Sequence, residues 1–411
     1  MNAVCETKPP ETASNSCIRM QVETGFAKLE TLRSVWDHAV AEYRGAIYMT
    51  YDWLEVWWEF YGQGKELRLY LFWEAEQLIG IVPLYIERLG LVRTKVARLI
   101  GSNIPPKVFN PAVKEEASFH VFKYLINHLF TVEKCDVLSL GPVSETWLPE
   151  AGLKKASEEV PDLVASAQYL RRDLQTIFRL PASFEEYLAG LSASERKNRL
   201  KRIRHLEKEH SLSVDVLCDS VSVAQEFERF QKQHSAQWKT LGKGGHFEAW
   251  PRSDEFNHAL VRRQAELDRV RFYRMLVDGK PVVSRYAFAF GSTVYSELPA
   301  REVGEPWDKL GIGGISLLKF NQQLIEHGVE YVDSGLGGYE HKTQLGGIEV
   351  PVGVWRIVSA RMPGRIRARL FFVYSTAVRF IAQKLWYRRI LPKLPLRFRR
   401  KQPAFSIRLD A

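Results

Sequence analysis

Residues 295–320 read Tyr295-Ser-Glu-Leu-Pro-Ala-Arg-Glu-Val-Gly-Glu-Pro-Trp-Asp-Lys-Leu-Gly311-Ile-Gly-Gly-Ile-Ser-Leu-Leu-Lys-Phe320. A strand-like run ends here, a polar loop follows, and glycines lead into an amphipathic helix predicted over 315–327. The N–H groups at a helix N-terminus are unpaired and carry partial positive charge, and glycine lets an anion approach the backbone. The longer segment Val294–Gly346 therefore predicts a cradle for a pyrophosphate group. The alternative is a glycine turn needed only for backbone shape.

The surroundings of this turn argue against two common phosphate sites. The helix lies between an antiparallel strand and a following strand over 329–334, which is not the topology of a Rossmann fold. The turn also lacks the Gly-Lys-Ser/Thr of a nucleotide P-loop, which argues against a kinase or a GTPase.

Two blocks of the chain have the same predicted order of elements, which is helices, a three-strand meander, a helix and a strand. The first block has helices over 26–43 and 51–61, strands over 67–73, 78–86 and 91–100, a helix over 117–130 and a strand over 135–140. The second has helices over 223–240 and 254–268, strands over 270–277, 281–290 and 293–299, the helix over 315–327 and the strand over 329–334. Residues 143–172 look like an irregular crossover, and 174–180 and 353–360 read as further strands. This order predicts an α+β fold.

Composition limits the class of protein and of partner. With 411 residues, 45% of them hydrophobic, the chain suits two domains. The net charge of +10 favours an anionic partner, such as CoA, tRNA, an anionic polysaccharide precursor or acidic lipid headgroups. The four cysteines are scattered without metal-ligand spacing, so we expect reduced thiols, a cytoplasmic location and no metal. Residues 1–17 are polar, lack the apolar core of a secretory signal, and are expected to be disordered.

Several motifs give the chain a family resemblance. They are Tyr51-Asp-Trp-Leu-Glu-Val-Trp-Trp-Glu-Phe-Tyr-Gly62, Leu78-Ile-Gly-Ile-Val-Pro-Leu84, Phe184-Glu-Glu-Tyr-Leu-Ala-Gly-Leu-Ser-Ala-Ser-Glu-Arg-Lys-Asn-Arg-Leu200, Gly311-Ile-Gly-Gly314, Val332-Asp-Ser-Gly335 and Gly338-Tyr-Glu-His-Lys342. In this order, over residues 25–358, the chain resembles the FemAB-like, BioF-like (CelD-type) acetyltransferase group of the GNAT superfamily.

The resemblance implies two tandem GNAT-like domains, each with a mixed, mostly antiparallel sheet flanked by helices. The expected divisions are a disordered N-terminus over 1–17, an N-terminal domain over 18–172, a catalytic domain over 173–360 and a basic amphipathic segment over 361–411. It further implies an N-acyltransferase that uses acetyl-CoA or another acyl-CoA. The implied acceptor is an amino group of a sugar or lipid-linked precursor in cell-envelope polysaccharide biosynthesis.

The resemblance and the residue chemistry together give a set of candidate site residues. Acyl transfer to an amine needs a base for the ammonium proton and an acid for the leaving thiolate. Glu297 is the candidate base and Tyr339 the candidate acid, in a direct transfer without a covalent intermediate. Donor binding is expected at Gly311, Ile312, Gly313, Gly314 and Lys342, and acceptor binding at Arg285, Arg301 and His341.

Two other functions stay open. Asp308 stands where the usual GNAT pattern has Gln or Arg, which leaves room for a Fem-type transferase that uses aminoacyl-tRNA. That alternative would bring tRNA as a partner, although nucleic acid is otherwise not expected. A non-catalytic GNAT-like subunit of a polysaccharide synthesis complex is the third reading.

Two segments are strongly basic. A predicted helix over 194–210 has a cluster of six basic residues within 196–204, which form either a solvated face or a phosphate-binding surface: Arg196, Lys197, Arg199, Lys201, Arg202 and Arg204. The segment 361–411 places apolar residues at helical spacing among arginines. It is either a helix packed on the second domain or a peripheral contact with the anionic inner face of the cytoplasmic membrane.

Overall fold

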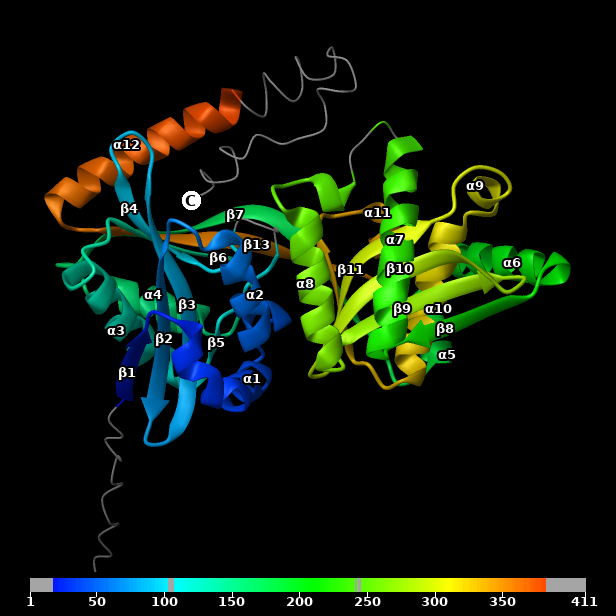
Figure 1. Cartoon of the computed structure of the whole chain (residues 1–411), viewed down its shortest axis with the longest axis horizontal. Helices are drawn as coiled ribbons and strands as arrows, with labels where there is room; N and C mark the ends of the chain where they lie inside the picture. The colour runs from blue at the N-terminus through cyan, green and yellow to red at the C-terminus, as the bar shows by residue number, and fades with distance from the viewer. Residues whose placement is uncertain (1–17, 103–106, 241, 243–244, 382–411) are drawn as a thin grey trace, which may run out of the picture.

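The computed structural model describes residues 18–102, 107–240, 242 and 245–381. Their strands form one continuous sheet that runs the length of the molecule (Figure 1). The strand order is β1-β2-β3-β4-β6-β13-β7-β12-β11-β10-β9-β8, with β5 beside β3. The strands are β1 (Ile18–Glu23), β2 (Glu66–Glu74), β3 (Gln77–Leu89), β4 (Thr94–Leu99), β5 (Ala112–Val113), β6 (Val137–Ser144), β7 (Val164–Arg179), β8 (Leu212–Leu217), β9 (Val270–Val277), β10 (Lys280–Phe290), β11 (Thr293–Arg301), β12 (Tyr331–Leu336) and β13 (Ile348–Ser359).

The helices follow the predicted spacing closely. They are α1 (Arg33–Glu42), α2 (Tyr51–Tyr61), α3 (Ser118–Thr131), α4 (Glu150–Glu158), α5 (Phe184–Gly190), α6 (Ala193–Glu209), α7 (Ser220–Thr240), α8 (Ser253–Glu266), α9 (Trp307–Leu310), α10 (Ile312–Glu326), α11 (Glu340–Thr343) and α12 (Met362–Arg379). Short 3-10 turns are η1 (Phe26–Leu32), η2 (Ile47–Met49), η3 (Glu115–Ala117) and η4 (His246–Glu248). Each basic or amphipathic helix expected within the described residues is present.

The predicted repeat of element order is confirmed by the pairing of the strands. In the first half β2, β3 and β4 are antiparallel and β4 runs parallel to β6. In the second half β9, β10 and β11 are antiparallel and β11 runs parallel to β12. The chain is therefore a mixed, mostly antiparallel α+β protein built from two similar halves.

Two long strands join these halves. β7 pairs with β12 through Gln175–Arg179 and with β13 along Val164–Ile177, while β13 also pairs with β6. The irregular crossover expected over 143–172 is wrong, because these residues form α4 and the start of β7. The polar run Arg171-Arg-Asp173 lacks the apolar alternation that would predict a strand, because this part of β7 is largely exposed. The predicted division at 172/173 lies inside β7 and stays a prediction.

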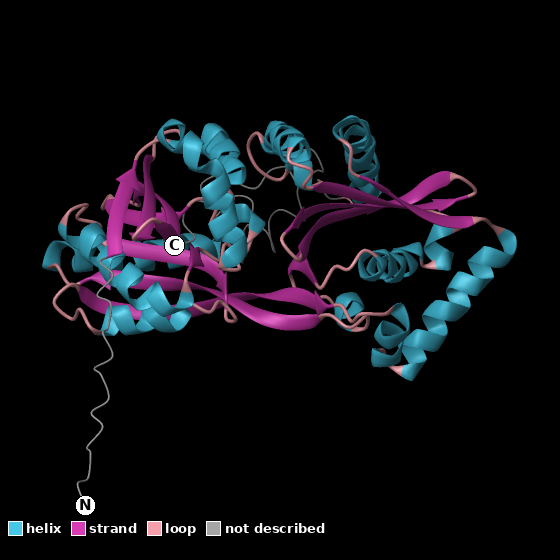
Figure 2. Cartoon of the chain, turned by 90° about the horizontal axis from the view of Figure 1, so that it is seen from below, coloured by secondary structure: helices cyan, strands magenta, loops and turns pink. Residues whose placement is uncertain are grey.

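Helices cover both faces of the sheet in the second half (Figure 2). Along β9, Phe272 packs in the same core as α7 and α8, whereas the next residue, Tyr273, packs in the core with α6 and α10. This is the alternation expected of a strand buried on both faces. The strand β8, which the sequence analysis missed, pairs with β9 at the end of the sheet.

The C-terminal segment is a helix in its described part. α12 packs on the first half, where Ala368 and Phe371 are buried beside β4 and β13. Residues 1–17, expected to be disordered, and 382–411 of the predicted basic segment lie outside the described residues. No described helix is both long enough and apolar enough to cross a bilayer.

Candidate active site

The candidate site lies where two parallel strands separate. β11 and β12 pair only from Thr293 to Tyr295 with Tyr331 to Asp333, and then diverge. A cavity of about 780 Å³ fills this wedge, lined by both strands, the start of α10, and parts of α6, α7 and η4. That volume is in the range of sites for small molecules and cofactors. Backbone groups in such a wedge have no strand partner on that side, so an extended amide-containing ligand can pair with them.

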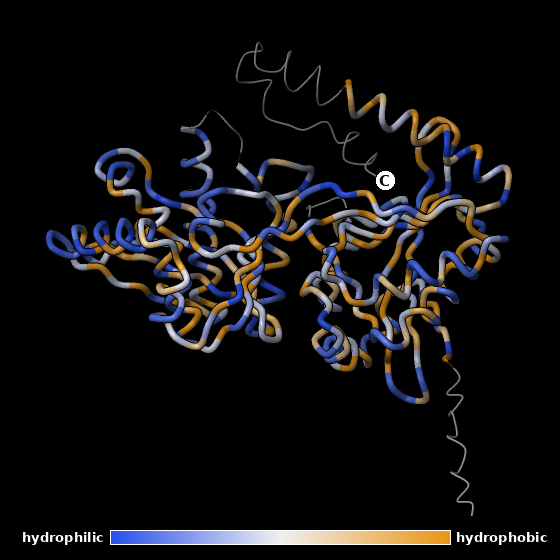
Figure 3. Tube along the Cα trace, turned by 180° about the vertical axis from the view of Figure 1, so that it is seen from behind, coloured by the Kyte–Doolittle hydropathy of each residue, from blue (hydrophilic) through white to orange (hydrophobic). Residues whose placement is uncertain are grey.

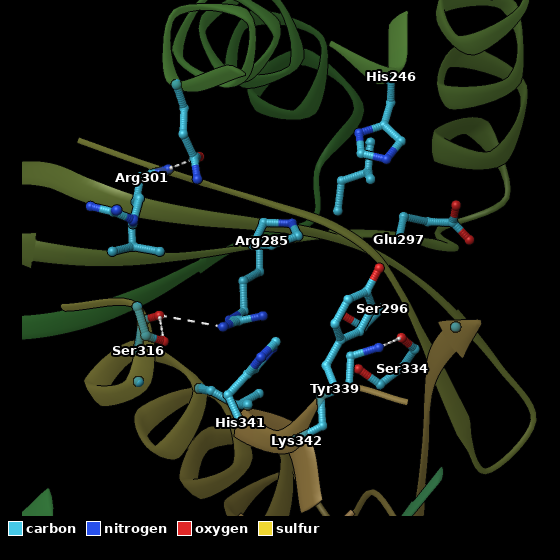
Figure 4. Close-up of a pocket in the computed structure, with 18 of the residues that line it drawn as sticks. His246, Arg285, Ser296, Glu297, Arg301, Ser316, Ser334, Tyr339, His341 and Lys342 are labelled. Atoms are coloured by element: carbon cyan, nitrogen blue, oxygen red, sulfur yellow. Dashed lines mark hydrogen bonds between the residues drawn. The ribbon is translucent and has the colours of Figure 1, made fainter. Parts of the chain in front are cut away.

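The ten residues predicted for the site all line this one cavity. They are Glu297 and Tyr339, then Gly311, Ile312, Gly313, Gly314 and Lys342, and then Arg285, Arg301 and His341. Figure 4 shows Tyr339, His341 and Lys342 on one side of it and Glu297 on the other. Their proximity is a finding, while the role assigned to each stays a prediction.

Two arginine side chains lie against the glycines of the turn. Gly311 has a φ of +65°, a conformation that glycine adopts without strain, and α10 starts at the next residue, three positions earlier than predicted. A Cβ on Gly311 would lie 2.3 Å from Nη1 of Arg202, and one on Gly314 would lie 1.9 Å from Nη1 of Arg199. Both arginines come from the basic helix α6. The sequence left open whether α6 is a solvated face or a phosphate-binding surface. The structure places Arg199 and Arg202 of this helix next to the predicted phosphate cradle.

Arg285 is a buried cation on β10. Its Nη2 donates to Oγ of Ser316 at 3.4 Å and its guanidinium lies over the ring of Phe320, but its Nε has no hydrogen-bond partner. No carboxylate among the described residues is within ion-pair distance, and burial lowers the pKa of Arg285 to about 10. A charge held in this way is costly unless an anion joins it. The side chain is therefore suited to an anionic ligand.

Asp308 has a structural explanation that does not involve a ligand. One carboxylate oxygen accepts from Nη1 of Arg301 at 2.5 Å, and the other accepts from the backbone N–H of Gly304 at 2.9 Å. The Arg301 guanidinium holds the pKa of Asp308 below its usual range. The acidic residue thus orients Arg301 and closes the loop before α9. Its presence does not count against a phosphate-bearing donor.

Glu297 lies at a bulge in β11 and is held from the first half of the chain. The register with β10 shifts between Leu298 and Ser296, so Glu297 is the extra residue. Its Oε1 accepts from the hydroxyl of Tyr48 at 2.8 Å, and its Oε2 is ion-paired with Nζ of Lys107. Burial, and then the Glu297 carboxylate, raise the pKa of Tyr48 well above its usual value. A carboxylate held by two donors is a poorer base than a free one.

On the opposite side of the cavity three side chains from one short segment lie together. The ring of Tyr339 stacks on that of His341 with centroids 5.7 Å apart, and Nζ of Lys342 lies 5.0 Å from the Tyr339 ring centroid. Lys342 donates to the backbone O of Ser334 at 2.7 Å. Burial lowers the pKa of Lys342 to about 8 and also lowers that of His341. Tyr339 is 54% exposed, so it can meet a ligand.

Several cavity residues escaped the sequence analysis. Tyr48 and Lys107 come from the first half, and His246, Trp238 and Trp250 come from α7 and the segment before α8. Asp333 was quoted only as part of a motif, yet it is buried, accepts from Gln175, and has a pKa raised by burial. The Tyr48, Lys107, Trp238, Trp250 and His246 positions show no local pattern, because only tertiary folding brings them to β11.

At the parallel pair of the first half, described residues of the chain lie beside the strand end. The pairing of β4 with β6 ends at Arg98 and Ser139, and further along β6 the backbone O of Pro142 accepts from the backbone N–H of Phe109 at 2.7 Å. The Phe109 ring packs against those of Trp53 and Tyr48. Phe109 therefore lies against β6 near the end of this parallel pair, whereas the cavity described above lies at the corresponding pair of the second half.

Among the described residues, no group of three or more His, Cys, Asp or Glu side chains lies in a position to hold a metal ion.

Comparison with known proteins agrees with this geometry. Residues 193–343 match the family described as an acetyltransferase (GNAT) domain. This segment contains α6, the wedge, the glycine turn and residues 339–342. The second half of the chain therefore carries the domain of a GNAT-type N-acyltransferase. No curated protein sequence matches the chain.

Solved structures extend the likeness to both halves. FemX, at 9% identity and a TM-score of 0.55, is covered over 97% of its length by 83% of this chain. The structure of L-PGS from Bacillus licheniformis has 12% identity and a TM-score of 0.47, with 80% of this chain and 92% of that one covered. A tandem GNAT protein from the clavulanic acid pathway has 11% identity and a TM-score of 0.37, with 83% and 99% covered. At such identity the FemX match establishes a shared fold.

Proposed function

We propose that this protein transfers an acyl group directly from an acyl-CoA, most simply acetyl-CoA, to a primary amine in the wedge between β11 and β12. The observation that carries the proposal is Arg285, a buried cation without a carboxylate partner among the described residues, in the same cavity as the glycine turn. Arg199, Arg202 and Arg301 surround that turn. Together these groups suit the phosphates of CoA, and the narrow wedge suits its extended amide arm.

In this proposal the two ends of the cavity bind different substrates. Figure 4 shows Arg301 and Ser316 at one end and His246 and Glu297 at the other. The donor phosphates would lie at the first end, and the acceptor amine would enter at the second. Tyr339, from the side between them, would protonate the leaving thiolate, while Glu297 supplies negative charge that attracts an ammonium group.

The acceptor we propose is an amino sugar or a lipid-linked glycan of the cell envelope. Two tryptophans line the cavity, Trp238 against His246 and Trp250 in the segment before α8, and Nε1 of Trp250 is a buried donor without a hydrogen-bond partner. Aromatic faces with a few polar groups suit a sugar ring. His341, Arg285 and Arg301, which line the cavity, would favour an acceptor that also bears an anionic group.

A Fem-type transferase that uses aminoacyl-tRNA is the second candidate, because the fold is shared with FemX. Calorimetry would separate the donors. We expect acetyl-CoA or a longer acyl-CoA to bind, and purified aminoacyl-tRNA not to compete. Tight binding of aminoacyl-tRNA with no binding of any acyl-CoA would reverse the choice, and binding of neither would favour a non-catalytic subunit.

A peripheral membrane contact through α12 completes the proposal. The inner face of α12 has the buried residues Ala368 and Phe371, and its outer face exposes Ile366, Leu370 and Val373. Arg365 and Arg369 are exposed beside them, and apolar and polar positions alternate along the helix (Figure 3). An exposed apolar stripe flanked by arginines suits an anionic lipid surface. The cytoplasmic location stays a prediction.

A further inference from the structure

Two histidines outside the predicted site form a connected pair at the acceptor end. Nε2 of His234, on α7, lies 3.0 Å from Nδ1 of His246, at the start of η4. His246 lines the cavity, and Nδ1 of His234 lies 3.3 Å from the backbone O of Pro299 on β11. The pair is thus anchored to the strand that carries Glu297.

The contacts of this pair fix which nitrogen of each ring carries a proton. The carbonyl O of Pro299 can only accept, so Nδ1 of His234 is the N–H donor. The backbone N–H of His246 donates to Nε2 of His234 at 3.4 Å, which identifies that nitrogen as an acceptor. Nδ1 of His246 must therefore donate to it as well, and Nε2 of His246 is left with a free lone pair.

The surroundings keep both rings neutral at physiological pH. Burial lowers the pKa of His234 to about 4, with His246 adding to the effect. Burial, and then the positive charge of Lys107, lower the pKa of His246. Glu297 on β11 is a further charged group at this end, as Figure 4 shows, and Asn257 on α8 also lines the cavity. The ring of Trp238 packs edge-on against His246, with centroids 4.9 Å apart, and restricts its rotation.

We propose that His246 is the general base for the acceptor amine, and that His234 is a positioning residue which sets its tautomer. The inference rests on the proposed acyl transfer and assigns its first proton step. Glu297 is a weaker choice for this step, because Tyr48 and Lys107 already occupy its two oxygens.

The step balances as follows. Nε2 of His246 takes one proton from the ammonium group, and the freed amine attacks the thioester carbonyl carbon. The C–N bond forms, the C–S bond breaks, and the electron pair leaves with sulfur. The second proton on nitrogen replaces the one that Tyr339 gives to the thiolate, so the products are the amide, CoA thiol and a protonated His246, which returns its proton to solvent.

The test combines kinetics with a measurement that does not need turnover. CoA release is followed with acetyl-CoA and a panel of amino sugars for the wild type, His246→Gln, His234→Gln, His234→Leu and the control His258→Gln. His258 lies on α8 away from the cavity lining, where its ring contacts Phe227. Nitrogen-15 NMR of histidine-labelled protein reports the tautomer of His246.

Loss of a general base lowers the rate by about 10²–10⁴-fold, so we expect that loss in kcat for His246→Gln, with unchanged affinity for acetyl-CoA and no loss for His258→Gln. The fall in rate at acidic pH should also disappear in His246→Gln. His234→Gln keeps an acceptor near Nδ1 of His246 and should retain more activity than His234→Leu. NMR should show His246 protonated at Nδ1 and bare at Nε2.

Three results would overturn the assignment. The first is a kcat for His246→Gln within twofold of the wild type. The second is a fall in the rate of that variant at acidic pH that matches the wild type. The third is a neutral His246 ring with its proton on Nε2. Retained acetyl-CoA affinity shows that a slow variant is folded. If the wild type transfers nothing to any amine, the proposed function fails and the base role falls with it, whatever tautomer NMR shows.

Discussion

The hydroxyl of Tyr48 donates a 2.8 Å hydrogen bond to the carboxylate of Glu297, across 249 positions of the chain. One residue belongs to the first half and the other to the bulge of β11 in the second. The ring of Tyr48 also contacts that of Tyr295, with centroids 5.4 Å apart. The first half is therefore a wall of the candidate site as well as a partner in the sheet.

This relationship makes Glu297→Gln and Tyr48→Phe informative together. We expect Glu297→Gln to lower kcat by about tenfold or more, because it leaves Lys107 without its carboxylate and removes the negative charge near the amine. Tyr48→Phe should cost less, since the Lys107 pair remains. Steady-state kinetics with thermal unfolding checks both. Full activity in Glu297→Gln with a normal melting temperature would remove Glu297 from the mechanism.

Tyr339→Phe tests the proposed acid. The phenol is lost while the ring that stacks on His341 stays, so acyl-CoA binding should be unchanged and kcat should fall by about 10²-fold or more. A donor with a better leaving group than CoA thiol should recover part of the rate. Equal losses with both donors would point to a packing role instead.

Arg285→Met separates binding from stability. A hydrogen-bonded charge contributes about 1.5–3 kcal/mol to binding, so the affinity for acetyl-CoA should fall by about 10–100-fold. Removal of a buried cation without an acidic partner among the described residues should leave the free energy of unfolding unchanged or higher. Calorimetry and urea unfolding measure the two quantities. A destabilised protein with normal affinity would contradict the assignment.

Gly314→Ala tests the contact between the glycine turn and α6. The added Cβ would meet Nη1 of Arg199 at 1.9 Å, so that side chain must move, and donor affinity should fall about tenfold. In an Arg199→Ala background the same change should have little further effect. Gly190→Ala is the control, because nothing lies within 4 Å of its added Cβ. Additive effects in the double mutant would show that the two residues act independently.

The pH dependence of donor binding should follow Lys342. Its pKa is lowered by burial from 10.5 to about 8 in the folded protein, so its charge is lost as the pH rises through about 8. Affinity for acetyl-CoA should weaken over that range, and Lys342→Arg should remove the dependence. Between about pH 8 and 10.5 the unfolded chain binds more protons at this residue, so its contribution to the free energy of unfolding rises with pH.

The membrane proposal is tested by sedimentation with anionic and neutral vesicles. Leu370→Ser combined with Val373→Ser should release the protein from anionic vesicles, since both side chains are exposed on α12. Val221→Ser, at an exposed valine of α7, is the control. Binding that is unchanged in the double variant, or equal for both kinds of vesicle, would contradict the proposal.

Local patterns predicted much of this fold and site. Alternation and turn residues located β9, β10 and β11, and the glycines located the start of α10 within three residues. The same segment holds most of the predicted site residues, so their meeting follows from local structure. Residues such as Tyr48, Lys107 and His246 reach the cavity only through packing between distant segments, and the spacing of residues along the sequence does not predict such packing. The alternating run Leu212-Ser-Val-Asp-Val-Leu217 did carry a strand signal, and it was missed.

The position of β13 between β6 and β7 has a consequence for biosynthesis. Residues 348–359 are made after the cavity-lining residues of the second half, yet they fill the gap between the two halves. A nascent chain that stops short of residue 348 leaves β6 with an open edge and β7 paired only near its end. The site therefore gains its final support late in translation, and neither half can be produced alone with its sheet complete.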